Sequence, residues 1–141
     1  MVETRIVALG LDVGTKRLGV AVGDSIGRLG MPVVTLAVDD AKLVSRLSEL
    51  IREHGAQQLV VGLPRNSNGE ETRQSTMVRQ FAHDTLEQLK LPIAFQDESL
   101  TSVMAEQRLQ TAKKSFAKAD IDSEAAAIIV QDYLEAHYAG H

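Results

Sequence analysis

The feature that most constrains the fold is an uninterrupted apolar run, Ile6–Leu11, which ends on an acidic residue, Asp12. A continuous apolar run of this length is typical of a strand that is covered on both faces of a sheet. In residues 18–22, large apolar side chains then alternate with glycine and alanine, which favours a second strand. We therefore expect a hairpin with a turn at 13–16, in which the sheet holds Asp12 rigidly at the end of the first strand.

The remaining periodicities predict an α/β fold. Further strands are expected at 31–36, 58–63 and 93–96, with Pro32 tolerated on an edge strand. Helices are expected from 43 to Gly55, with Asp39 or Asp40 as the N-cap, and from about 71 to 90. Two more are expected from 101 or 102 to about 110 and from about 121 to 137. Right-handed crossovers would make strand 58–63 parallel to the first strand, which predicts a five-stranded mixed sheet with helices on both faces.

Length and composition limit the class of protein. The 141 residues predict one domain over 1–141, and the absence of cysteine excludes disulfides and thiolate zinc sites. No signal-peptide core or membrane-length apolar stretch is present, so we expect a cytoplasmic protein with no membrane partner. A net charge of −4 argues against coating nucleic acid through bulk charge, but it permits local binding through a metal ion and a few lysines.

Acidic residues follow or open the elements that should meet at one edge of the sheet. Asp12 ends the first strand, Asp97 and Glu98 follow the last, and Asp120 and Asp122 open the final helix. Ligands of open α/β sheets bind outside the carboxyl ends of the strands. Because neighbouring strand residues point to opposite faces, either Asp97 or Glu98 should reach this edge, but not both. The helical line through Asp122 is apolar and should face the sheet, whereas Asp120 suits an N-cap whose line faces solvent.

Three converging carboxylates would repel one another unless a cation neutralised them. Ligand sets made of oxygen atoms select Mg²⁺ or Mn²⁺ rather than zinc, and two such ions can drive phosphodiester cleavage. The ordinary alternatives are a turn cap for Asp12, a solvated strand end for Asp97 and an N-cap for Asp120.

Basic residues provide candidate phosphate contacts. The segment 113–118 contains Lys113, Lys114 and Lys118 around Phe116, which suits phosphate binding with stacking on an unpaired base. The alternative is a solvated loop whose aromatic ring folds onto the core. Weaker candidates lie in loops near the same sheet edge: Lys16, Arg17 and Arg65. Residues 65–69 are also consistent with an ordinary turn.

Four ordered motifs resemble the YqgF family, bacterial proteins described as pre-16S rRNA nucleases and as Holliday junction resolvase-like. The motifs are Leu11-Asp-Val-Gly-Thr-Lys-Arg-Leu-Gly-Val-Ala-Val22, Val61-Gly-Leu-Pro64 with Asn66 and Gly69, Asp97-Glu98 with Leu100-Thr101, and Asp122-Ser123 before an alanine-rich helix. This resemblance covers nearly the whole chain. It implies a ribonuclease H-like fold, a cytoplasmic nuclease acting in 5′-end maturation of small-subunit ribosomal RNA, and Asp12, Glu98 and Asp122 as catalytic metal-binding acids.

The chain departs from the family pattern at two places and differs from the better-characterised junction resolvases at a third. Ser99 stands where the family commonly has arginine, and Asn68 stands in a turn that usually contains aspartate. The better-characterised junction resolvases place an acid at the end of the fourth strand, where this chain has Gly62, Leu63 and Pro64. Glu98 would then supply that carboxylate from the fifth strand.

Other functions stay open at this point. The alternatives on the same fold are a Holliday junction resolvase-like DNA endonuclease and a non-catalytic nucleic-acid-binding module. The Asp-x-Gly-Thr segment at 12–15 is also similar to the first phosphate loop of sugar kinases, actin and chaperone-type ATPases. Those proteins close two such domains around ATP, whereas this chain has a single Asp-x-Gly-Thr segment. Precursor rRNA and branched DNA both remain candidate partners, and the oligomeric state is open.

Overall fold

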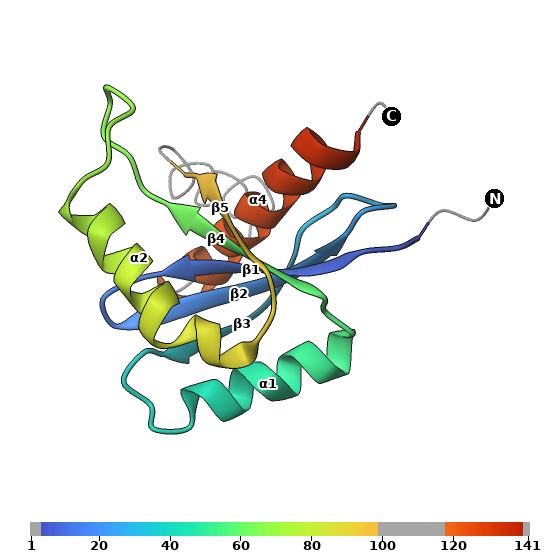
Figure 1. Cartoon of the computed structure of the whole chain (residues 1–141), viewed down its shortest axis with the longest axis horizontal. Coiled ribbons are helices and arrows are strands. Elements are labelled where there is room, and N and C mark those ends of the chain that lie inside the picture. Colours follow the sequence, from blue (N-terminus) through green and yellow to red (C-terminus); the bar gives the residue numbers. More distant parts are fainter. Residues whose placement is uncertain (1–3, 99–117, 140–141) are drawn as a thin grey trace.

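The computed structural model describes residues 4–98 and 118–139, which form a mixed sheet flanked by helices (Figure 1). The sheet has five strands in the order β3-β2-β1-β4-β5. Its elements in chain order are β1 (Val7–Val13), β2 (Arg17–Asp24), β3 (Met31–Ala37), α1 (Leu43–His54), β4 (Gln58–Leu63), α2 (Arg73–Asp84), the 3-10 helix η1 (Leu86–Leu89), β5 (Ile93–Asp97) and α4 (Lys118–Tyr138). The five strands that the periodicities predict are all present.

The strand pairing brings three carboxyl ends to one edge of the sheet. β1 runs antiparallel to β2 and parallel to β4, and β4 runs parallel to β5. In the turn between β1 and β2, the Gly14 amide donates to the Arg17 carbonyl at 2.8 Å, so the start of β2 lies at this same edge. Pro32 lies in β3, which is an edge strand as predicted.

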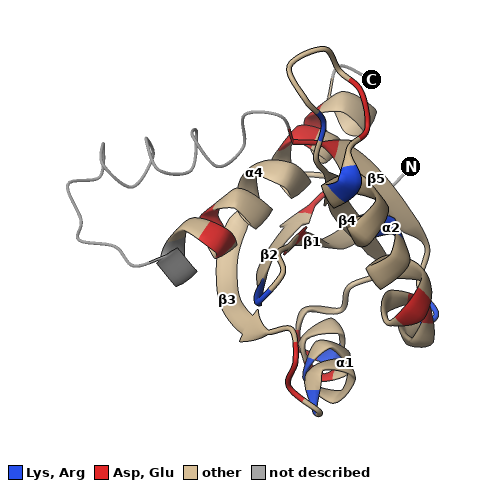
Figure 2. Cartoon of the chain, turned by 90° about the vertical axis from the view of Figure 1, so that its left-hand side faces the viewer, with Lys and Arg blue, Asp and Glu red and all other residues tan. Residues whose placement is uncertain are grey.

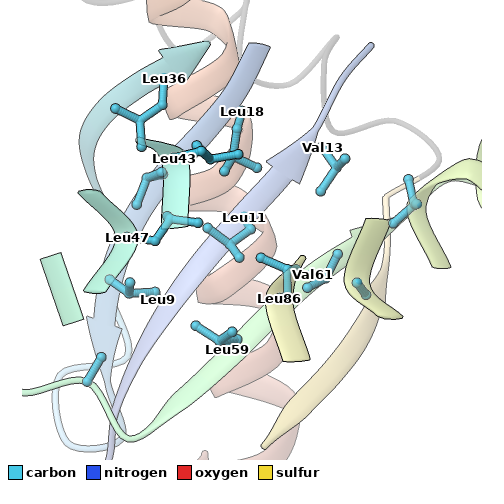
Figure 3. Packing of buried hydrophobic residues seen from close by; sticks show 14 of the residues in the cluster. Leu9, Leu11, Val13, Leu18, Leu36, Leu43, Leu47, Leu59, Val61 and Leu86 are labelled. Carbon is cyan, nitrogen blue, oxygen red and sulfur yellow. The ribbon is translucent and has the colours of Figure 1, made fainter. Parts of the chain in front are cut away.

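Helices cover both faces of the sheet. Figure 2 shows α4 on one side of the strands and α1 and α2 on the other. Alternation along β1 sends Leu9 and Leu11 into the core beneath α1, α2 and η1, where they pack with Leu47, Leu59 and Leu86 (Figure 3). The opposite face of β1, which ends with Asp12, therefore faces α4.

The ends of the first two helices differ from the prediction. The N-cap of α1 is Lys42, whose amide donates to Asp40 Oδ1 at 2.8 Å, so neither Asp39 nor Asp40 is the cap residue. Gly55 ends α1 in the left-handed conformation (φ 66°), as predicted.

The predicted helix 71–90 is shorter and divided. A capping box between Thr72 and Ser75 starts α2 at Arg73, and α2 ends at Asp84 before η1 begins. Asp84 and Thr85 are both weak helix formers, which accounts for the break at this point.

Helix α4 starts earlier and is more deeply buried than expected. It begins at Lys118, so Asp120 lies inside the helix and is not its N-cap. Ile129 and Tyr133 face the sheet as predicted, but Glu124 and Ala127, expected to face solvent, are also buried. The reason is that α4 crosses the sheet over β1, β2 and β3, which encloses more than one of its faces. The helix predicted at 101–110 lies outside the described residues.

None of the described helices combines the length and the apolar character that crossing a membrane requires.

Candidate active site

Asp12 and Glu98 lie together at the carboxyl edge of the sheet. Glu98 directly follows β5, and its amide donates to the Leu63 carbonyl of β4 at 3.3 Å. The carboxyl groups of Asp12 and Glu98 are joined by a hydrogen bond on the face that α4 covers. Asp97 points away, with 63% of its side chain exposed, and binds Arg65 Nε through Oδ1 at 2.5 Å. Alternation predicted that one member of the pair would reach this edge and the other would not, and the structure places Glu98 there.

Gly62 leaves the space that the Glu98 carboxylate occupies. A Cβ atom at Gly62 would lie 2.8 Å from Glu98 Oε2 and 2.4 Å from Ile129 Cδ1. Both distances are too short for real contacts. A side chain at this position of β4 would thus compete directly with Glu98 for space, which gives a physical reason for glycine at position 62.

Burial and neighbouring acidic groups raise the pKa values of both acids. Burial raises the pKa of Asp12 to about 6, with a further rise from the nearby Asp122 charge. Burial, then the charge of Asp12, raise the pKa of Glu98 to about 9. Both pKa values are raised, so the two carboxyl groups share a proton across their contact near neutral pH. Two half-buried acids in contact, both with raised pKa values, are a candidate site for binding a cation.

Asp122 is brought to this edge by close packing of α4 on β2. A Cβ atom at Gly19 would lie 2.0 Å from the Asp122 carbonyl oxygen, so this approach of helix to strand requires glycine. The Asp122 carboxylate accepts a hydrogen bond from Arg17 Nε at 2.5 Å. Asp122 is therefore positioned by β2 twice, through the backbone contact and through the ion pair.

The three acids line one cavity of about 320 Å³. Its walls comprise Asp12, Val13, Gly14, Pro64, Arg65, Gln74, Glu98 and Asp122. Within the described residues, no three acidic or histidine side chains already lie close enough together to hold a metal ion. Asp12 and Glu98 meet, while Arg17 holds Asp122. The donor set consists of carboxylate oxygens, whose chemistry suits Mg²⁺ or Mn²⁺; Asp12 and Glu98 could hold such an ion together, and Asp122 would be the third ligand if its carboxylate left Arg17.

The basic candidates divide into two groups. Arg65 lines the acidic cavity, while Lys16 and Arg17 line a neighbouring cavity of about 430 Å³. Lys113, Lys114 and Phe116 lie outside the described residues, as does the side chain of Lys118, although Lys118 begins α4. The departure at Ser99 lies outside them too.

Gln74 is a site residue that the sequence analysis missed. It lies in the first turn of α2 and lines both cavities. The capping residues Thr72 and Ser75 were a readable signal for the helix start. The spacing of these two residues places Gln74 at the N-terminal end of α2. The local sequence does not show, however, where that end lies relative to the three acids.

We expect Gly62→Ala to displace the Glu98 carboxylate and to lower metal-dependent turnover by about 10-fold or more, because small displacements of reacting groups are costly. The fold should survive, since both atoms that the new methyl group meets are the ends of flexible side chains. Initial rates and thermal melts would measure this. Gly27→Ala is the matched control, because its Cβ meets an ordinary contact at 3.7 Å. Wild-type turnover in Gly62→Ala would show that Glu98 does not depend on this space.

Solved structures share the fold. Thermus thermophilus RuvC in complex with a Holliday junction substrate superposes with a TM-score of 0.55 at 15% identity, covering 95% of this chain and 97% of RuvC. A second T. thermophilus RuvC structure gives 0.53 at 13% identity, covering 93% and 95%. The predicted ribonuclease H-like α/β fold is confirmed.

Sequence comparisons identify the class of protein and then its family. Proteins named "Putative pre-16S rRNA nuclease" are 41% identical over 133 residues in Chloroflexus aurantiacus and 40% identical over 134 residues in Synechocystis. These alignments cover 92% and 93% of this chain and 87% and 88% of the relatives. The protein is a nuclease, an enzyme of the hydrolase class. The model of the family RuvX, described as Holliday junction resolvase, matches residues 6–136, and the chain belongs to this family, which is the YqgF family that its motifs predicted.

Proposed function

We propose that this protein is a divalent-metal-dependent nuclease that hydrolyses phosphodiester bonds, with Asp12, Glu98 and Asp122 as its catalytic metal ligands. The observation that carries the proposal is the half-buried pair of Asp12 and Glu98, which meet in a cavity that Asp122 also lines. A non-catalytic binding module would gain stability from replacing two mutually repelling buried acids, so their presence favours catalysis.

The chain's own residues supply placement and charge. Asp12 belongs to β1, and β1 is paired with β2 on one side and with β4 on the other. The sheet therefore holds the Asp12 carboxylate rigidly. Asp12 and Glu98 would hold the cation in their ionised form, so the proton shared by the pair would be released to solvent on binding. A bound Mg²⁺ or Mn²⁺ would supply Lewis-acid chemistry at the phosphodiester. Arg65, Lys16 and Arg17 at the two cavities are placed to bind flanking phosphates of the strand.

For the substrate we propose precursor 16S ribosomal RNA, cleaved in 5′-end maturation, with action in the cytoplasm. The names of the relatives from Chloroflexus and Synechocystis support this choice. Branched DNA is the second candidate, which the family description and the fold shared with RuvC favour. The active unit is proposed to be one domain spanning 1–141, without a membrane partner.

Incubation of the pure protein with precursor 16S rRNA and with a four-way DNA junction, each with Mg²⁺ or Mn²⁺, tests the proposal. We expect cleavage of the rRNA precursor near its mature 5′ end and no cleavage in EDTA. Preferential cleavage of the junction would replace the substrate proposal with the second candidate. Cleavage of neither substrate with either ion would contradict the catalytic function.

The lysine-rich segment gives a separate prediction for substrate binding. Replacing Lys113, Lys114 and Lys118 together with alanine should weaken binding of the RNA precursor, because these residues form the densest basic run in the chain. The slope of log binding constant against log salt concentration should fall by up to about three counterions. Filter binding over a salt series measures it. An unchanged slope would mean that the segment is solvated and does not contact phosphate.

A further inference from the structure

The ion pair between Arg17 and Asp122 joins the start of β2 to the first turns of α4. Arg17 Nε lies 2.5 Å from Asp122 Oδ2. The arginine side chain is 41% exposed and the aspartate side chain 22% exposed. The bond is therefore short, yet solvent reaches both partners, which is the situation in which an ion pair exchanges readily for another partner.

Asp122 stands at the boundary between two cavities of opposite character. The acidic cavity contains the Asp12–Glu98 pair, and the neighbouring cavity contains Lys16 and Arg17. Asp122 lines both, together with Gly14 and Gln74. The Asp122 carboxylate, which would complete an oxygen ligand set with Asp12 and Glu98, is thus bound to Arg17 of the neighbouring cavity.

We infer that Arg17 occupies Asp122 in the metal-free protein, and that a divalent cation takes over this carboxylate and so frees the Arg17 guanidinium to bind a phosphate of the nucleic-acid strand. The inference rests on the proposed function. It explains why the described residues contain two acids in contact but no complete group of three. It also assigns Arg17 two successive partners, one before and one after the metal binds.

The exchange is favourable on both sides. A divalent cation coordinates a carboxylate oxygen directly and more closely than a guanidinium approaches it, whereas an ion pair as exposed as that of Arg17 and Asp122 is weak. The released guanidinium is planar and always charged, and it matches the two-point geometry of phosphate oxygens. Lys16 lies beside it in the same cavity, so the phosphate would meet two cations there.

The first test measures Mn²⁺ binding by calorimetry in the absence of nucleic acid. Arg17→Met should bind Mn²⁺ about fivefold more tightly than the wild type, because the metal no longer displaces the guanidinium. Lys16→Met is the matched control: it removes the same charge from the same cavity, but the Lys16 side chain has no described ion pair with Asp122. Lys16→Met should therefore change the affinity for Mn²⁺ clearly less than Arg17→Met does. Thermal melts confirm that each variant is folded.

A double-mutant cycle isolates the competition for Asp122. In an Asp122→Asn background, Arg17→Met should alter Mn²⁺ affinity no more than Lys16→Met does, since there is no carboxylate left to contest. If the wild type binds Mn²⁺ and Arg17→Met binds no more tightly than Lys16→Met, the exchange is wrong while the proposed function stands. If neither the wild type nor Arg17→Met binds Mn²⁺, the exchange and the proposed metal-dependent function are both contradicted.

The second test concerns the freed guanidinium. A fluorescent single-stranded RNA is titrated in Ca²⁺, which accepts the same oxygen ligands, and in EDTA over a salt series. Arg17→Met should lower the salt slope by about one counterion in Ca²⁺ and leave it unchanged in EDTA, where Asp122 still holds the arginine. Equal salt slopes for the wild type and Arg17→Met in Ca²⁺ would overturn the release of Arg17 to phosphate. A decrease in the salt slope of Arg17→Met that is as large in EDTA as in Ca²⁺ would overturn it too.

Discussion

Asp12→Asn should lower divalent-dependent cleavage by at least about 100-fold while leaving the protein folded. Changes to groups that merely support a metal ligand cost 10- to 100-fold, so loss of a ligand itself should cost no less. The fold should persist because asparagine has the same shape and because the substitution removes a charge that burial and the nearby Asp122 carboxylate disfavour. Initial rates in Mg²⁺ and Mn²⁺, with thermal melts of the metal-free protein, provide the measurement.

Asp84→Asn is the matched control, because it makes the same chemical change on an exposed side chain. Asp84 lies at the C-terminal end of α2, whereas Gln74 lies in the first turn, so this variant should keep wild-type turnover. Turnover of Asp12→Asn near that of the wild type in either ion would remove Asp12 from the metal site. Lost turnover together with an unfolded protein would instead assign Asp12 a structural role.

The metal-free protein should lose about 2 to 4 kcal/mol of unfolding free energy between pH 5 and pH 8. The pKa of Glu98 rises from 4.5 to about 9 on folding, and that of Asp12 rises from 3.8 to about 6. Between each unfolded and folded pKa the native state binds more protons than the unfolded state, so the unfolding free energy falls as the pH rises. Urea unfolding in EDTA at several pH values measures the fall.

Glu98→Gln should flatten most of this dependence and should make the metal-free protein more stable than the wild type at pH 8. Glu49→Gln on the exposed face of α1 is the control and should follow the wild-type curve. Saturating Mg²⁺ should restore wild-type stability at pH 8, because it binds the ionised native site. If the unfolding free energy of the wild type does not fall between pH 5 and pH 8, the raised pKa values of Asp12 and Glu98 are contradicted.

Much of the fold was predictable because its signals are local. The apolar run before Asp12 and the alternating residues of the next strand specified the hairpin, and alternation along β5 separated Glu98 from Asp97. Helix limits were less accurate: a lysine caps α1, and α4 begins before Asp120. The burial of Glu124 was missed because its line on the helix is polar, whereas tertiary packing over three strands decided its exposure.

The site itself was only half predictable from the sequence. The three acids could be named, but the contacts that tune them join residues far apart in the chain. Gly62 leaves room for Glu98, and Gly19 lets the backbone of Asp122 approach β2. Both glycines are needed because two elements approach each other closely in the folded protein, and the local sequence pattern does not specify that approach. The Arg17–Asp122 pair links residues 105 positions apart, and neither partner's neighbours indicate the other.

The proposed ligands also come from opposite ends of the chain, Asp12 from the first strand and Asp122 from the last helix. A growing chain that has folded only its N-terminal hairpin has one acid and no cavity. Even with β5 in place, the face of the sheet that bears Asp12 stays uncovered until α4 has been made. Contacts of such large sequence separation form late in folding. A chain shortened before α4 would therefore lack both the third proposed carboxylate and the cover over Asp12, so the proposed cleavage of nucleic acid depends on the last described helix.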